Sequence, residues 1–203
     1  KRNMKQWQAE QIASAEKKAM PIFSFPGGRL IGVTVEELVK DGHLQALCME
    51  SIAKKYPQMG IALSLMDLSV EAEAFGAKVM YSEDEVPTMH GALIETEEQA
   101  DALQVPPVGA GRTGECVKGI KEACELITDR PVLAGLIGPY SLAGRLLDMT
   151  EIMILCYEEP EMVETVLGKV TDFLVEYAKA FKEAGANGVL MAEPAAGLLS
   201  PSL

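Results

Sequence analysis

The chain has 203 residues, 48% of them hydrophobic, which is enough for one sizeable core. Acidic residues outnumber basic ones by 30 to 18, and the net charge of −12 argues against a nucleic-acid partner or an anionic membrane surface. No apolar run approaches the length of a membrane span, and the first twenty residues are too polar for a signal peptide, so we expect a cytoplasmic protein with no membrane role.

Residues 1–20 are rich in Ala, Gln and Lys and predict an accessory helix ahead of one domain over residues 21–203. The domain opens with Pro21–Pro26, which is typical of a short apolar strand, and a loop at Gly27–Arg29. The glycines would let a ligand approach the backbone, which makes Arg29 a candidate for binding an anion. A surface turn that happens to contain an arginine explains the stretch equally well.

A second apolar strand is predicted over Ile61–Met66, with Asp67 at its carboxyl end and a helix closing at Gly76. A carboxylate there would point into a ligand-binding mouth, where it could accept hydrogen bonds or act as a base. Capping the following helix is an equally consistent role. Glu71 and Glu73 lie two residues apart on that helix, so at most one of them can join Asp67.

The segment Gly109–Gly114 matches the glycine pattern of dinucleotide-binding loops, but it follows Pro106-Pro107 rather than a strand. We therefore interpret it as a loop that caps a helix from about Glu115 to Thr128.

The sharpest change of period comes at Val132–Ile137, a continuous apolar run typical of a parallel strand buried on both faces. Gly138-Pro139 ends it, and Ser141 is a candidate cap for the next helix. Because ligands bind at the loops after such strands, Tyr140, Ser141 and Arg145 are candidates to contact a substrate. The alternative is that they only cap and solvate the helix.

A third buried strand is predicted at Gly188–Ala192, after a long amphipathic helix, with Glu193 at its carboxyl end. Three buried strands separated by helices indicate a parallel α/β architecture. A closed barrel needs eight strands and usually about 250 residues. We therefore expect an incomplete amino-terminal portion of a (β/α)8 TIM barrel, with an open sheet edge.

The metal-binding residue types are dispersed. The cysteines, Cys48, Cys116, Cys124 and Cys156, show no C-x-x-C spacing and are expected to be reduced and buried. His43 and His90 have no His or Cys partner at metal-ligand spacing, so we predict structural roles for both and no metal site in this chain.

Three motifs occur in the order seen in the uroporphyrinogen decarboxylase superfamily, which also contains the corrinoid-protein:coenzyme M methyltransferases. They are Asp67–Gly76, Gly138–Ala143 and Glu193–Pro201. With the Gly28-Arg29 loop, the resemblance spans roughly residues 20–203, about the first half of a family member. It implies the (β/α)8 barrel of that superfamily.

Departures from the decarboxylase pattern favour the methyltransferase branch. Of the paired arginines in the decarboxylase loop only Arg29 is kept, and Arg145 and Pro194 stand where that branch has a tyrosine and a serine. Those losses would remove donors that hold a tetrapyrrole with many carboxylates. The run Val70–Ala74 resembles the methyltransferases instead.

By that resemblance, a methyl group passes from a methylated corrinoid protein to a small thiol activated by zinc. The His-x-Cys and later Cys that hold the metal would lie beyond residue 203. The resemblance makes Asp67 a catalytic candidate that orients polar groups near the metal, and it makes Arg29, Tyr140, Arg145 and Glu193 candidates for substrate binding.

Two alternatives stay open. One is a uroporphyrinogen decarboxylase, a lyase of porphyrin biosynthesis. The other is a non-catalytic assembly module, in which a half-barrel self-associates through its open sheet edges.

Overall fold

The computed structural model describes residues 2–23 and 25–200, which form helices around a small parallel sheet. In chain order the helices are α1 (Met4–Ala13), α2 (Gly28–Ile31), α3 (Val35–Lys40), α4 (Gly42–Lys55), α5 (Val70–Ala74), α6 (Glu97–Ala102), α7 (Thr113–Leu126), α8 (Pro139–Leu147), α9 (Glu151–Glu158) and α10 (Pro160–Glu183). Two short 3-10 turns lie at Phe25–Gly27 and Ala196–Leu198.

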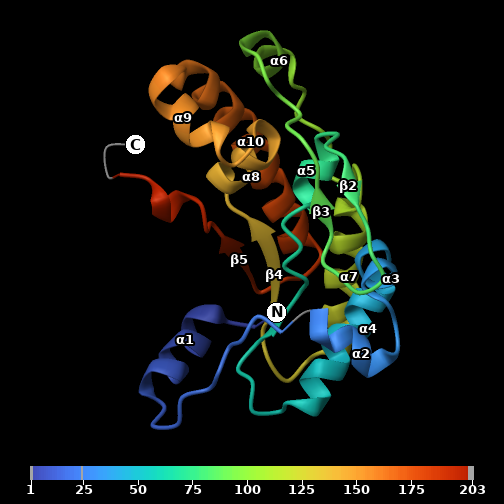
Figure 1. Ribbon diagram of the computed structural model, residues 1–203. Coiled ribbons are helices and arrows are strands. Elements are labelled where there is room, and N and C mark those ends of the chain that lie inside the picture. The colour runs from blue at the N-terminus through green and yellow to red at the C-terminus, as the bar shows by residue number, and fades with distance from the viewer. Residues whose placement is uncertain (1, 24, 201–203) are drawn as a thin grey trace.

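The main sheet has three parallel strands in the order β1 (Ala62–Leu63), β4 (Val132–Ile137) and β5 (Gly188–Ala192). Ala62 pairs with Val132, and Leu133 pairs with Gly188. Figure 1 shows β4 at the centre, with α8, α9 and α10 gathered above it. The parallel order brings the residues after β1, β4 and β5 to one end of the sheet, as the sequence predicts.

A separate antiparallel pair, β2 (Val79–Met80) and β3 (Thr88–Met89), lies within the stretch between α5 and α6. Its register pairs Val79 with Met89.

Helix α10 supplies one wall of the core. Its apolar stripe is buried at Val166, Val170, Phe173, Tyr177 and Phe181, a spacing of three to four residues. The rings of Phe173 and Tyr177 lie 5.6 Å apart, and those of Tyr177 and Phe181 lie 4.3 Å apart. The predicted amphipathic helix is confirmed.

The predicted bounds of strands β4 and β5 are confirmed, and Gly76 follows α5 as predicted. A polar cap and two glycines mark the ends of three helices. Thr34 caps α3 in a reciprocal capping box with Glu37, whose carboxylate accepts a hydrogen bond from the Thr34 N–H. Gly76 and Gly185 follow α5 and α10 with φ of 100° and 109°, backbone angles that a side chain would strain.

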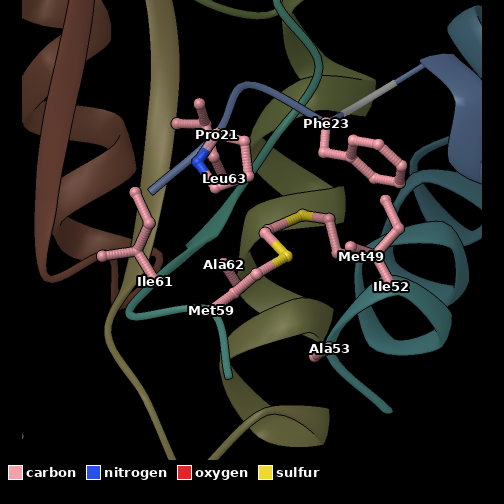
Figure 2. A pocket seen from close by; sticks show the side chains of 9 residues that line it. All are labelled: Pro21, Phe23, Met49, Ile52, Ala53, Met59, Ile61, Ala62 and Leu63. Atoms are coloured by element: carbon pink, nitrogen blue, oxygen red, sulfur yellow. The ribbon is translucent and has the colours of Figure 1, made fainter. Parts of the chain in front are cut away.

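The predicted strand at Pro21–Pro26 does not form in the part of it that is described, and Ser24 lies outside the described residues. Pro21 has no N–H for a ladder, and the backbone contact to the neighbouring strand region is one bond from Gly60 N–H to the Ala19 carbonyl. Figure 2 shows Pro21 and Phe23 packing instead against apolar side chains of α4 and β1 around a cavity of about 10 Å³. Side-chain packing thus replaces strand pairing.

The expectation that the third strand is buried is wrong, because two of its five residues are exposed and the other three are only partly buried. Val189 and Met191 on β5 are 42% and 49% exposed. Strand β5 pairs only with β4 among the described residues, so one face and the outer edge lack the layer that covers β4. The first strand is also shorter than predicted, with two residues in the ladder.

The accessory helix ends at Ala13, short of its predicted extent, because the chain turns back and Lys17 Nζ donates to the carbonyls of Gln11 and Ile12. None of its residues is buried. Cys48 is buried as predicted, whereas Cys116, Cys124 and Cys156 are only partly buried. Within residues 2–23 and 25–200 we find no helix with the length and apolar character needed to cross a membrane.

Candidate functional site

Asp67, the carboxylate after β1, is only 6% exposed, and both of its oxygens have bonding partners. Its Oδ1 accepts from the N–H and the hydroxyl of Ser69, at 3.0 and 2.6 Å, and its Oδ2 pairs with Arg112 Nη1. A buried carboxylate is tolerated when a cation and hydrogen bonds compensate it, and both are present here. Asp67 is therefore held in one orientation at the strand end.

Arg112 comes from the glycine-rich loop before α7. Gly109 and Gly111 have φ of 107° and 54°, and the Gly109 N–H donates to Thr113 Oγ1 at 2.9 Å. That tight turn delivers the Arg112 guanidinium to Asp67, 45 residues earlier in the chain. The predicted loop before a helix is confirmed, but α7 begins at Thr113, and the arginine faces carboxylates rather than a phosphate.

Glu73 shares the same guanidinium, so one of the two glutamates joins Asp67 as the helical spacing predicts. Its Oε2 accepts from Arg112 Nε at 2.7 Å, and the hydroxyl of Tyr81 donates to its other oxygen. Burial lowers the pKa of Arg112, but the charges and hydrogen bonds of the two carboxylates outweigh it and the net pKa is raised. Arg112 is a permanent cation.

Tyr81 packs against the cluster of Asp67, Glu73 and Arg112. Burial and its bond to Glu73 raise the pKa of Tyr81 to about 12, so the phenol stays neutral. The ring lies under two cations, with Lys40 Nζ at 4.0 Å and the Arg112 guanidinium carbon at 5.1 Å from its centroid.

Glu71 turns toward β4. It is 2% exposed, and its Oε1 accepts from the Ile137 N–H at 3.1 Å, at the end of that strand. Burial raises the pKa of Glu71 to about 7; the bond from Ile137 and the charge of Arg112 lower it, and the charge of Asp67 raises it. Glu71 thus links helix α5 to the end of β4.

Glu193, the carboxylate after β5, caps helix α8. It accepts from the N–H groups of Tyr140 and Ser141, at 2.9 and 2.8 Å, and from the Ser141 hydroxyl. A carboxylate stabilises the positive end of a helix dipole and satisfies its unpaired N–H groups. The cap of α8 therefore comes from a residue that is distant in the sequence and is brought close by the fold.

Ser141 is not the helix cap that the sequence suggested. Helix α8 begins at Pro139, with Gly138 at the cap position, so Ser141 lies inside the first turn. Its hydroxyl bonds to Glu193 and accepts from the Ala195 N–H at 3.2 Å. A Cβ on Gly138 would lie 2.1 Å from Glu193 Oε2, so glycine is required for this cap to approach.

Of the candidate residues, Asp67 lies in the cluster around Arg112, Tyr140 and Glu193 form a second cluster, and the cations Arg29 and Arg145 are bonded to neither. Tyr140 and Glu193 come together, and the Tyr140 hydroxyl lies 3.7 Å from Cys156 Sγ; burial, followed by the interaction with Cys156, raises the pKa of that phenol. Arg29 is exposed on α2 and Arg145 is partly buried on α8. Neither arginine side chain has a hydrogen bond or ion pair within the described part of the chain.

Arg112 was missed as a site residue in the sequence. The signal was present: an arginine inside a glycine-rich turn directly before a helix, in a chain with excess acid. What the sequence lacks is the direction of that turn, which decides the carboxylates it reaches.

The described residues do not fit a zinc ion. Among them no group of three or more His, Cys, Asp or Glu side chains is placed to hold a metal. His43 Nδ1 contacts Glu122 at 2.7 Å near the surface, and His90 is exposed.

The model of the family described as "Uroporphyrinogen decarboxylase (URO-D)" matches residues 18–203. The chain belongs to the uroporphyrinogen decarboxylase family. The match contains both clusters at the strand ends, the Asp67–Arg112 group and the Glu193 cap.

Similar proteins come from both branches of the family. The chain is 30% identical to a methylcobamide:CoM methyltransferase MtbA of Methanosarcina acetivorans over 132 residues, 64% of this chain and 39% of that protein. It is 28% identical to a uroporphyrinogen decarboxylase of Myxococcus xanthus over 164 residues, 76% of this chain and 46% of that protein. The chain spans less than half the length of these relatives.

A solved methyltransferase from Methanosarcina mazei has the same fold, with a TM-score of 0.86 and 20% identity. The superposition covers 100% of this chain and 63% of that one. The parallel strands and their helices therefore form part of the α/β barrel fold of the family's methyltransferases, as the resemblance implies.

Proposed function

We propose that the protein transfers a methyl group from a methylated corrinoid protein to a small thiol. In that reaction a carbon–sulfur bond replaces the carbon–cobalt bond, and the thiol gives up its proton. The similarity to methylcobamide:CoM methyltransferases supports the proposal.

The charge at the strand ends is the observation that favours methyl transfer over decarboxylation. Asp67, Glu73 and Glu193 lie there, and Arg112 is already shared by two of them. A tetrapyrrole with many carboxylates needs several uncommitted cations. An acidic strand end suits a small acceptor and disfavours the polyanionic substrate of the decarboxylase branch.

Asp67 and Arg112 are proposed to fix the geometry of this end of the sheet. A buried ion pair with further hydrogen bonds holds its polar groups in place without reorganisation during a reaction. The zinc that the resemblance implies would need ligands outside the described residues, so the roles proposed here are those of orientation and substrate binding.

The test is a methyl-transfer assay with the longest product of the gene's reading frame, methylcobalamin as donor and coenzyme M as thiol. We expect loss of methylcobalamin absorbance that requires both protein and thiol. Uroporphyrinogen is assayed in parallel. Decarboxylation without methyl transfer would overturn the proposal and favour the decarboxylase branch.

We also propose that residues 1–203 self-associate through β5, as in the alternative of a half-barrel assembly module. The exposed Val189 and Met191 and the outer edge of β5, which has no strand partner among the described residues, support it. Sizing in solution tests the idea, and a monomer at all concentrations would contradict it.

A further inference from the structure

Glu71 is the buried carboxylate that the two strand-end clusters leave incompletely bonded. Its Oε1 accepts a hydrogen bond from the Ile137 N–H at 3.1 Å. Among the described residues, its Oε2 is the one buried side-chain nitrogen or oxygen atom without a hydrogen-bond partner. A buried ionised oxygen without a partner is costly, so native structures pair, hydrate or neutralise such groups.

A small cavity lies beside this carboxyl. Its volume is about 10 Å³, close to the minimum for one water molecule, and its lining includes Gln45, Ser64, Asp67, Glu71, Cys116 and Tyr177. Polar side chains take part in this lining, whereas the residues around the cavity beside Phe23 are all apolar, so this cavity offers the hydrogen-bond partners that a buried water requires.

The charges around Glu71 do not balance if it is ionised. Asp67 and Glu73 both bind Arg112, so an ionised Glu71 would be a third negative charge near a single guanidinium. Across the cavity, Cys116 on α7 and Tyr177 on α10 add no charge near neutral pH, because burial raises the pKa of Cys116 to about 12 and that of Tyr177 well above its usual value.

We infer that the Glu71 carboxyl keeps a proton on Oε2 in mildly acidic solution and, through that proton, donates a hydrogen bond to one water molecule held in this cavity. The proton removes the surplus negative charge, and the water accepts from Oε2 while Ser64 and Gln45 supply further polar partners. Glu71 is thus a buried proton-binding site, a proton store, in the cavity that Asp67 and Arg112 also line. It rests on the geometry of the chain and is independent of the methyl-transfer proposal.

The pH dependence follows from the sign of the shift. The folded-state pKa of Glu71, about 7, lies above the ordinary glutamate value of 4.5, so the folded protein binds more protons between these values. Stability from this group is therefore greatest below the unfolded pKa and is lost as pH rises toward and through about 7.

Infrared spectroscopy of the chain tests the proton directly. Ordinary carboxyl groups are ionised at about pH 6. We therefore expect one carbonyl band of a protonated carboxylic acid near pH 6, its loss by about pH 8.5, and its absence from Glu71→Gln at both. No band in the parent protein near pH 6, or a band that persists in folded Glu71→Gln, would overturn the inference. The parent titration stands even if the variant does not fold.

A matched pair of variants tests the coupling to stability. Glu71→Gln should gain in unfolding midpoint relative to the parent as pH is raised from about 5 to 8, because the amide never ionises. Glu73→Gln, two residues along the same helix, should instead lose stability near pH 8, since it weakens the pair with Arg112. A Glu71→Gln variant less stable than the parent near pH 8 would contradict the proton store.

The water is tested by a high-resolution crystal structure near pH 6. Density for one water within hydrogen-bond distance of Oε2 is expected. A dry cavity would overturn that half of the inference.

Discussion

A carboxylate follows both β1 and β5, with Asp67 four residues after Leu63 and Glu193 directly after Ala192, yet the two acids have different roles. Asp67 is buried, and its partners are a guanidinium from a distant loop and Ser69. Glu193 is partly exposed, and its partners are the N–H groups and a hydroxyl at the start of α8. The difference shows that position after a strand brings an acid to the site, whereas the facing element decides what it does.

The largest expected effect is on the Asp67 side. Arg112→Met would leave Asp67 and Glu73 without their cation, and losing one partner of a buried pair costs about 3–5 kcal/mol of unfolding free energy. Urea unfolding measures it. Arg145→Met is the control, a partly buried arginine whose side chain has no hydrogen bond or ion pair with the described residues, and we expect a change within about 0.5 kcal/mol. Equal losses of unfolding free energy in both variants would contradict the idea that the ion pairs of Arg112 stabilise the fold.

A medium effect is expected where β4 meets α8. Gly138→Ala places a Cβ 2.1 Å from Glu193 Oε2, which forces the cap away and costs about 1–3 kcal/mol. Gly168→Ala is the matched control, because no atom lies within 4 Å of its added Cβ in the middle of α10. That change should stabilise by about 0.5–1 kcal/mol. Thermal unfolding of both variants decides whether the tight approach at Gly138 matters.

The smallest effect tests the charge of the Glu193 cap. Glu193→Gln keeps one of the two acceptor oxygens and loses the attraction to the helix dipole. The charge contributes about 0.3–1 kcal/mol at low salt, and that part of the loss should shrink as salt is added. Glu161→Gln, in the exposed first turn of α10, provides the comparison. A salt-independent loss at Glu193 would mean that the hydrogen bonds, and not the charge, provide the capping.

The sequence predicted much of this arrangement from local patterns. The apolar period gave the bounds of β4 and β5, and the spacing of Glu71 and Glu73 separated their roles correctly. It failed at Pro21–Pro26, because a strand requires a partner along its edge and local composition does not supply one. It also failed at Ser141, because the cap of α8 comes from Glu193, 52 residues further along the chain.

By itself, the sequence determined β4, β5, the long helix α10 and the acids after the strands, because periodicity and turn residues act over a few positions. Only the tertiary structure decided that Asp67 pairs with Arg112, that Glu71 is buried with one oxygen unpartnered, and that β5 exposes half of its side chains. These outcomes depend on the path of a glycine-rich turn and on which layer covers a strand. Such long-range contacts are set by packing and charge compensation across the whole chain, which no local pattern encodes.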